Sequence, residues 1–92
     1  MIYFEWDDYK AVANLVKHGV SFEMAKEVFH DPDAVDFEDR TMDYGELRRR
    51  IIGIGSGVFL MVAYTERGEA IRIISARRAT KAERRFYENN QW

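Results

Sequence analysis

RRRIIGIGSGVFLMVAYTERGEAIRIISAR, residues 48–77, decides the fold. Three apolar runs occupy 48–55, 58–65 and 70–77, and two short breaks that contain glycine separate them. Such breaks between strand-like runs are typical of hairpins, so the stretch predicts an antiparallel three-strand meander. The run VFLMVAYT lacks polar alternation, which predicts a central strand buried on both faces. No Gly-Lys-Ser/Thr follows GIGSG, so its glycines indicate a hairpin rather than a phosphate loop.

The residues before the meander begin with a short strand and a helix. IYFEW at 2–6 is rich in the β-branched and aromatic residues of strands. Asp7 can cap the helix that follows, and Lys17-His18-Gly19 predicts its end, with cations in the last turn and then a glycine. Apolar residues recur along this helix at helical spacing: Tyr9, Val12, Ala13 and Val16.

A second helix and a further strand are predicted next. Ser21 can cap the helix, and Asp31-Pro32 closes it because a residue before proline avoids the α conformation. Its apolar stripe comprises Phe22, Ala25, Val28 and Phe29. Alternation over 35–38 then predicts a half-exposed strand that runs into an acidic loop. We expect the acids here to form a solvated edge: Asp36, Glu38, Asp39, Asp43 and Glu46.

The last helix has a strong start signal. Thr80 and Glu83 fit a capping box, in which each side chain binds the other residue's backbone N–H. No repeat or linker interrupts the chain. The sequence therefore predicts a single α+β domain over residues 1–92.

Composition narrows the classes of function. The 92 residues include no cysteine, and His18 and His30 are too far apart for a helical zinc pair, so we expect no metal and no cofactor. The N-terminus lacks the pattern of a signal peptide. No segment approaches the roughly 20 apolar residues that span a bilayer. We expect a cytoplasmic protein without membrane contact.

Charge is unevenly divided. Residues 1–47 contain twelve acids and four Lys or Arg, a net charge of −8, whereas residues 48–92 contain four acids and ten Lys or Arg, a net charge of +6. Such asymmetry indicates an anionic partner for the basic half. Attraction between the two halves within one fold is an equally good explanation from charge alone.

Arginines gather where the last strand passes into the last helix: Arg72, Arg77, Arg78, Arg84 and Arg85. Strict alternation would place Ile73 with Arg77 on one face of the strand and Ala76 with Arg78 on the other. On the helix, Arg84 and Tyr87 share a side, and we expect Ala82 and Phe86 to contact the sheet. A guanidinium beside a tyrosine suits a phosphate with a stacked base. The alternative is that these arginines pair with the acidic half, or with Glu83 and Glu88.

Lys17 and His18 allow two interpretations. Cations at a helix C-terminus complement its dipole. Alternatively, His18 could carry a proton, because the pKa of histidine lies near working pH.

Several motifs together resemble the BrnT toxin family. They are F-E-W-D at 4–7, K-H-G-V-S-F-E at 17–23, D-P at 31–32, T-E-R-G at 65–68, R-I-I-S-A-R-R-A-T at 72–80 and E-R-R-x-Y-E at 83–88. They occur in order and span nearly the whole chain. The resemblance implies a RelE-like fold, with an N-terminal strand and two helices packed on an antiparallel sheet and a C-terminal helix.

The resemblance also implies a function. BrnT proteins are toxins of type II toxin–antitoxin systems, metal-independent endoribonucleases that inhibit translation by cutting RNA, free or bound to the ribosome. The implied partner is a BrnA-type antitoxin with a ribbon-helix-helix part, and the complex represses its own operon, so operator DNA is met only through the antitoxin. The expected catalytic residues are Arg77, His18, Lys17, Arg67 and Tyr87. The expected RNA-binding residues are Arg72, Arg78, Arg84 and Arg85.

Two rival functions remain open from the sequence. A non-catalytic module could use the basic cleft to bind the antitoxin and assist operator binding, with Arg77 as an anchor for an acidic segment. A housekeeping RNA-binding domain without a paired gene is the other. A pI near 5.7 is low for a protein that binds RNA, because neutralisation of phosphates dominates the affinity for nucleic acids.

Overall fold

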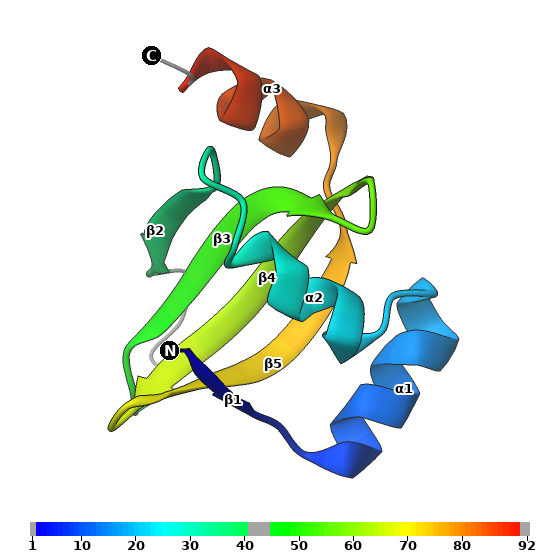
Figure 1. Ribbon diagram of the computed structural model, residues 1–92, viewed down its shortest axis with the longest axis vertical. Helices are drawn as coiled ribbons and strands as arrows, with labels where there is room; N and C mark the ends of the chain where they lie inside the picture. The colour runs from blue at the N-terminus through cyan, green and yellow to red at the C-terminus, as the bar shows by residue number, and fades with distance from the viewer. Residues whose placement is uncertain (1, 41–44, 91–92) are drawn as a thin grey trace.

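The computed structural model describes residues 2–40 and 45–90. Within them, helices and strands follow in the predicted order (Figure 1). The elements are β1 (Tyr3–Glu5), α1 (Asp8–His18), α2 (Phe22–Val28), β2 (Val35–Asp39), β3 (Arg48–Gly55), β4 (Val58–Arg67), β5 (Ala70–Arg78) and α3 (Lys81–Asn89). The α+β prediction is therefore confirmed.

The strands form one mixed sheet in the order β1-β5-β4-β3-β2. The antiparallel meander of β3, β4 and β5 is confirmed, and Ser56 and Gly57 make its first turn with φ of 51° and 76°. The central strand β4 is buried as predicted, with Leu60 and Met61 on its two faces. The expectation of an N-terminal strand packed on an antiparallel sheet is wrong for β1, which joins the sheet and pairs in parallel with β5. Two helices and three strands separate these two, so no hairpin dictates their relative direction.

Polar side chains begin all three helices at the predicted places. Asp7 and Ser21 each accept a hydrogen bond at 3.1 Å from the backbone N–H three residues later. Thr80 and Glu83 form the capping box. α1 ends at Gly19, whose φ of 68° is left-handed and free of strain for glycine. None of the helices in the described ranges is long and apolar enough to cross a membrane.

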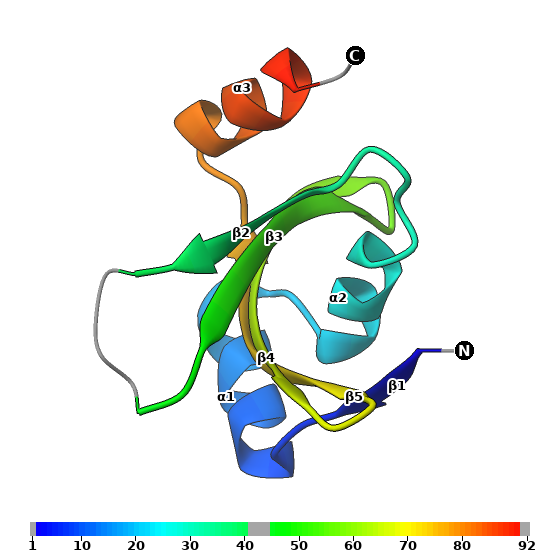
Figure 2. The ribbon, with the colours of Figure 1, turned by 90° about the vertical axis from the view of Figure 1, so that its left-hand side faces the viewer.

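The main core lies between α2 and the sheet, which curls around this helix (Figure 2). Phe22, Ala25 and Val28 of α2 are buried, as the predicted stripe requires. A Cβ added at Gly55 would lie 2.4 Å from the carbonyl oxygen of Met24. This glycine therefore lets the backbone of α2 approach β3 closely.

A β-bulge in β5 reverses the side-chain alternation. The register with β4 passes from Ile73 to Ser75 without a partner for Ile74. Ile73 and Ala76 consequently both enter the core beneath α2. The predicted alternation is wrong beyond Ile74, because one extra residue shifts each later side chain to the other face. Arg77 thus points to the face opposite α2.

α1 closes the part of the β5 edge beyond β1. β1 pairs with Ala70–Arg72. Further along, the buried side chain of Asn14 donates to the Ala76 carbonyl oxygen at 2.7 Å and accepts from the Ala76 N–H at 3.1 Å. These bonds satisfy backbone groups that an edge strand would otherwise expose. The apolar stripe that predicted α1 lies on its outer side, away from these contacts.

Candidate functional site

Arg77 and Glu83 join the end of β5 to the first turn of α3. Arg77 Nη1 donates to Glu83 Oε1 at 2.8 Å and Nη2 donates to Oε2 at 2.9 Å. Arg77 Nη1 also donates to the Arg78 carbonyl oxygen at 3.1 Å. Parallel bonds between a guanidinium and a carboxylate fix the orientation of both groups. The Arg77 guanidinium therefore has a fixed orientation before any RNA or partner binds.

This ion pair stabilises both charges. The Arg77 guanidinium holds the pKa of Glu83 below its usual range, and the Thr80 backbone N–H adds to the effect. The hydrogen bonds to Glu83 raise the pKa of Arg77. The alternative that an arginine of the cluster pairs with Glu83 is thus confirmed for Arg77.

Tyr87 anchors α3 to the sheet. Its ring is buried in a small core with Ile52 and Met61 and meets the Phe59 ring edge to face at 5.3 Å. Its hydroxyl donates to Asp31 Oδ2 at 2.9 Å. Burial, together with Asp31, raises the pKa of Tyr87 to about 12. The sequence placed this ring beside a bound base, whereas the structure packs it against Phe59.

The remaining arginines of the cluster lie around this anchor. The Arg84 guanidinium stacks over the Phe59 ring, 4.4 Å from its centroid, and lies 3.9 Å from Glu88. Arg78 and Arg85 are exposed. The junction of β5 and α3, here termed the β5–α3 corner, therefore gathers four of the five predicted arginines: Arg77, Arg78, Arg84 and Arg85.

Five arginines share the sheet face opposite α2, here termed the open face. They are Arg48 and Arg50 of β3, Arg67 of β4, and Arg72 and Arg77 of β5. Met61 points into the small core under α3, and its register partner Arg77 shares that face. Ala63 and Thr65 follow on the same face because side chains alternate, and they pair with Arg50 and Arg48. Arg48 and Arg50 were not predicted as site residues, although the run R-R-R at the start of a strand places its first and third members on one side.

Each open-face arginine already has a carboxylate within 4 Å. The pairs are Arg48–Glu46 at 3.3 Å, Arg67–Glu46 at 3.8 Å, Arg50–Asp39 at 3.1 Å, Arg72–Glu5 at 2.9 Å and Arg77–Glu83 at 2.8 Å. Attraction between the acidic and basic halves is thus confirmed. The predicted solvated edge is wrong for Asp39, which is buried against Arg50. Asp43 lies outside the described residues.

The other predicted catalytic residues lie at different distances from the corner. Lys17 and His18 end α1 one turn beyond Asn14, toward the end of β5 that carries Arg77 (Figure 1). Arg67 lies at the opposite end of the open face, beside Arg72. Five residues of strand at ~3.3 Å each put Arg72 about 17 Å from Arg77. The predicted arginines therefore fall into two groups: those at the β5–α3 corner, and the distant pair Arg67 and Arg72.

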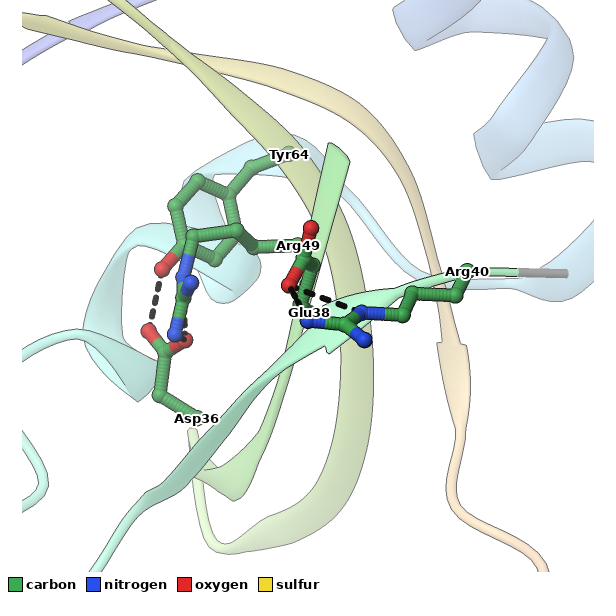
Figure 3. Close-up of polar contacts among 5 residues, drawn as sticks. All are labelled: Asp36, Glu38, Arg40, Arg49 and Tyr64. Atoms are coloured by element: carbon green, nitrogen blue, oxygen red, sulfur yellow. Dashed lines mark hydrogen bonds and ion pairs between the residues drawn. The ribbon is translucent and has the colours of Figure 1, made fainter. Parts of the chain in front are cut away.

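A second polar cluster, also missed from the sequence, ties β2 to β4 across β3 on the α2 side of the sheet (Figure 3). Asp36 accepts hydrogen bonds from the Tyr64 hydroxyl and, at 2.7 Å, from Arg49 Nε. Burial and Asp36 raise the pKa of Tyr64, so its hydroxyl stays neutral. Glu38 accepts two bonds from Arg40. Asp36, which is exposed, and Glu38 therefore lie on the edge strand β2 as expected, and both also bind arginines.

One family matches the chain. The profile described as "Ribonuclease toxin, BrnT, of type II toxin-antitoxin system" matches residues 6–83 of the 92. The matched range begins just before α1 and extends to Glu83, so it includes both members of the Arg77–Glu83 pair. Comparison with curated proteins gives no match. Among the described residues, no three His, Asp or Glu side chains are grouped to hold a metal ion.

Proposed function

The chain belongs to the BrnT family of ribonuclease toxins from type II toxin–antitoxin systems, and we propose that it cleaves RNA at the β5–α3 corner without a metal ion. The observation that supports this site is the gathering of five arginines on the open face, with Arg77 held in a fixed orientation at its end. In this proposal the domain is RelE-like, works in the cytoplasm and inhibits translation by cutting RNA, either free or on a ribosome.

Metal-free cleavage needs a base, an acid and cations around one phosphate. The ribose 2′-hydroxyl loses its proton to the base and attacks the adjacent phosphorus, while the bond from phosphorus to the 5′-oxygen breaks. The leaving 5′-oxygen takes a proton from the acid, so the products are a 2′,3′-cyclic phosphate and a 5′-hydroxyl. Arg77 stabilises the charge that develops on the phosphorane oxygens.

Glu83 is the base in this proposal. A phosphate that binds Arg77 competes with Glu83 for the same guanidinium. Loss of that guanidinium removes the main cause of the low pKa of Glu83, so its carboxylate becomes a stronger proton acceptor beside the reacting group. His18, or Lys17 beside it, supplies the proton to the leaving oxygen.

The remaining arginines bind the RNA backbone. Arg78, Arg84 and Arg85 lie at the corner and contact the phosphates next to the cleaved bond. Arg72 lies about 17 Å away along the open face, and Arg67 lies beyond it. Both bind a more distant part of the RNA strand. Tyr87 acts indirectly in this arrangement, because its buried ring and its bond to Asp31 hold α3 in place.

Control by a partner completes the proposal. Family membership implies an antitoxin. We infer that it is of the BrnA type, with a ribbon-helix-helix DNA-binding part, and that the complex represses its own operon. In this complex the antitoxin binds the operator DNA, and the toxin is linked to the DNA only through the antitoxin.

One observation favours a second candidate, a non-catalytic module that binds the antitoxin and strengthens operator binding. Every open-face arginine is already paired with a carboxylate of the chain. An acidic antitoxin segment could replace these carboxylates one for one, with Arg77 as its anchor.

Cleavage by the antitoxin-free protein in EDTA separates the two candidates. We expect products that end in a cyclic phosphate, and a loss of at least ~100-fold in rate for Arg77→Ala. Arg40→Ala is the matched control, since Arg40 is an exposed arginine paired with Glu38 outside the corner. Absence of cleavage, together with absence of growth arrest on expression without antitoxin, would assign the chain to the second candidate.

A further inference from the structure

We propose that the outer face of α1, formed by Tyr9, Val12, Leu15 and Val16, is a docking site for an amphipathic helix of the antitoxin. This inference rests on the antitoxin partner that family membership implies. It concerns a surface separate from the arginines of the open face.

The outer face of α1 is unusually apolar for a surface. Tyr9 is 90% exposed, Val12 64%, Leu15 51% and Val16 83%. Tyr9, Val12 and Val16 follow at i, i+3 and i+7, so they form one continuous stripe on the helix. Single exposed apolar residues are normal, whereas a contiguous stripe marks an interaction surface.

The stripe is bordered by hollows that suit side chains of a partner. One hollow lies between α1 and the start of α2 and includes Trp6, Leu15 and Phe22 in its lining. A second lies over Tyr9 and Val12 near the start of α1. Apolar side chains at helical spacing on a partner helix can enter such hollows in turn.

Charges at the rim specify the chemistry of the partner. Asp8 lines one hollow and Glu23 lines the other. Lys10 and Lys17 border the stripe on the side away from Asp8. On a helix of 3.6 residues per turn they are turned 100° and 80° from Tyr9 in one direction, whereas Asp8 is turned 100° in the other. Glu23 already pairs with Lys26 at 3.1 Å, so the docked helix should have Lys or Arg on the flank that meets Asp8.

Area argues against a second copy of this chain as the occupant. α1 has 11 residues, or about 16 Å of helix at ~1.5 Å per residue. A stable dimer buries roughly 800 Å² on each partner, more than four side chains on so short a helix can supply. An antitoxin chain can contact further surface beyond α1. The stripe also follows α1 toward His18, at the end of α1 that lies toward the end of β5 (Figure 1).

The test measures the affinity of the full-length toxin for the full-length antitoxin encoded beside it, by titration calorimetry. Val16→Glu should weaken binding by about 100-fold, because it buries a charge against an apolar helix. Leu47→Glu is the matched control: this leucine is 57% exposed, its carbonyl oxygen binds Thr65 of β4, and the change should alter the affinity less than about twofold. Tyr9→Glu provides a second probe if Val16→Glu impairs folding.

RNA cleavage and thermal unfolding are measured on the same variants without antitoxin. Unchanged cleavage by Val16→Glu, with lost neutralisation, supports the docking face independently of the corner. If the wild type does not cleave RNA, the binding result still decides the present proposal. The proposal fails if Val16→Glu and Tyr9→Glu bind like wild type, if the antitoxin does not bind the wild type, or if the wild type alone is a dimer that Val16→Glu dissociates.

Discussion

Glu83 receives Arg77 and the Thr80 backbone through the same oxygen: Oε1 accepts from Arg77 Nη1 at 2.8 Å and from the Thr80 N–H at 2.9 Å. One carboxylate therefore begins α3 and neutralises the arginine at the end of β5. The geometry of the helix start and the availability of Arg77 for a phosphate are consequently coupled.

Glu83→Gln should separate affinity from catalysis. Glutamine can still serve in a capping box, so α3 keeps its start, but Arg77 loses its competing charge. We expect affinity for an uncleavable 2′-O-methyl RNA to rise roughly fivefold and cleavage to fall at least ~100-fold. Fluorescence anisotropy and single-turnover cleavage measure the two effects.

Glu88→Gln is the control for this change, because Glu88 is exposed and lies 3.9 Å from Arg84. It should alter both quantities less than about twofold. Cleavage by Glu83→Gln that rises together with affinity would show that Glu83 only masks Arg77 and is not the base.

The lowered pKa of Glu83 makes the stability of the corner pH-dependent. A carboxyl whose pKa is lower in the folded chain stabilises the fold above its unfolded pKa, about 4.3, and that stabilisation is lost as pH falls through the folded pKa. The difference in unfolding free energy between wild type and Glu83→Gln should be constant from about pH 5.5 to 7 and shrink below about pH 4.3. Urea denaturation from pH 3 to 7 measures it. A difference that grows on acidification would contradict the ion pair.

Tyr87→Phe removes the hydroxyl that binds Asp31. We expect a loss of about 1–2 kcal/mol in unfolding free energy at pH 7. The pKa of Tyr87 is raised to about 12, so its stabilisation is present below the unfolded pKa of about 10 and is lost as pH rises through the folded value. The advantage of wild type over the variant should therefore decline above about pH 10. Tyr9→Phe, at a site 90% exposed, should leave stability unchanged, and an equal loss there would refute the assignment.

Gly55→Ala tests the close approach of α2 to β3. The new Cβ would lie 2.4 Å from the Met24 carbonyl oxygen, so backbone must move, and we expect a loss of about 2–4 kcal/mol in unfolding free energy. Gly57→Ala meets no atom within 4 Å and acts only through its φ of 76°, so about 1 kcal/mol is expected. Urea midpoints compare the two. Equal losses would mean that conformation, not contact with α2, governs both sites.

The sequence predicted the elements well because their signals are local. Caps at Asp7, Ser21 and Thr80 and a tight turn at Gly57 each act within a few residues. The parallel pairing of β1 with β5 and the bulge at Ile74 depend on strands far apart in the chain. No local pattern encodes them.

The candidate site was predicted in part for the same reason. Arg77 stands out at the join of a strand and a helix. Arg50 joins it only through the register of β3, β4 and β5. The burial of Tyr87 depends on which side of α3 meets the sheet. Helical spacing wrongly assigned that side to Ala82 and Phe86, which are exposed.

The contacts of β5 determine when during synthesis the domain can be completed. Arg72 bonds Glu5 across 67 residues of chain, and Ala76 bonds Asn14 across 62. A ribosome makes β1 and α1 first, yet both must wait for their partners in β5, which are made more than 60 residues later. A nascent chain that stops before β5 lacks the partner of its own first strand and also lacks Arg77. The sheet and the proposed catalytic Arg77 therefore depend on the same strand, so a translation product interrupted before β5 has neither.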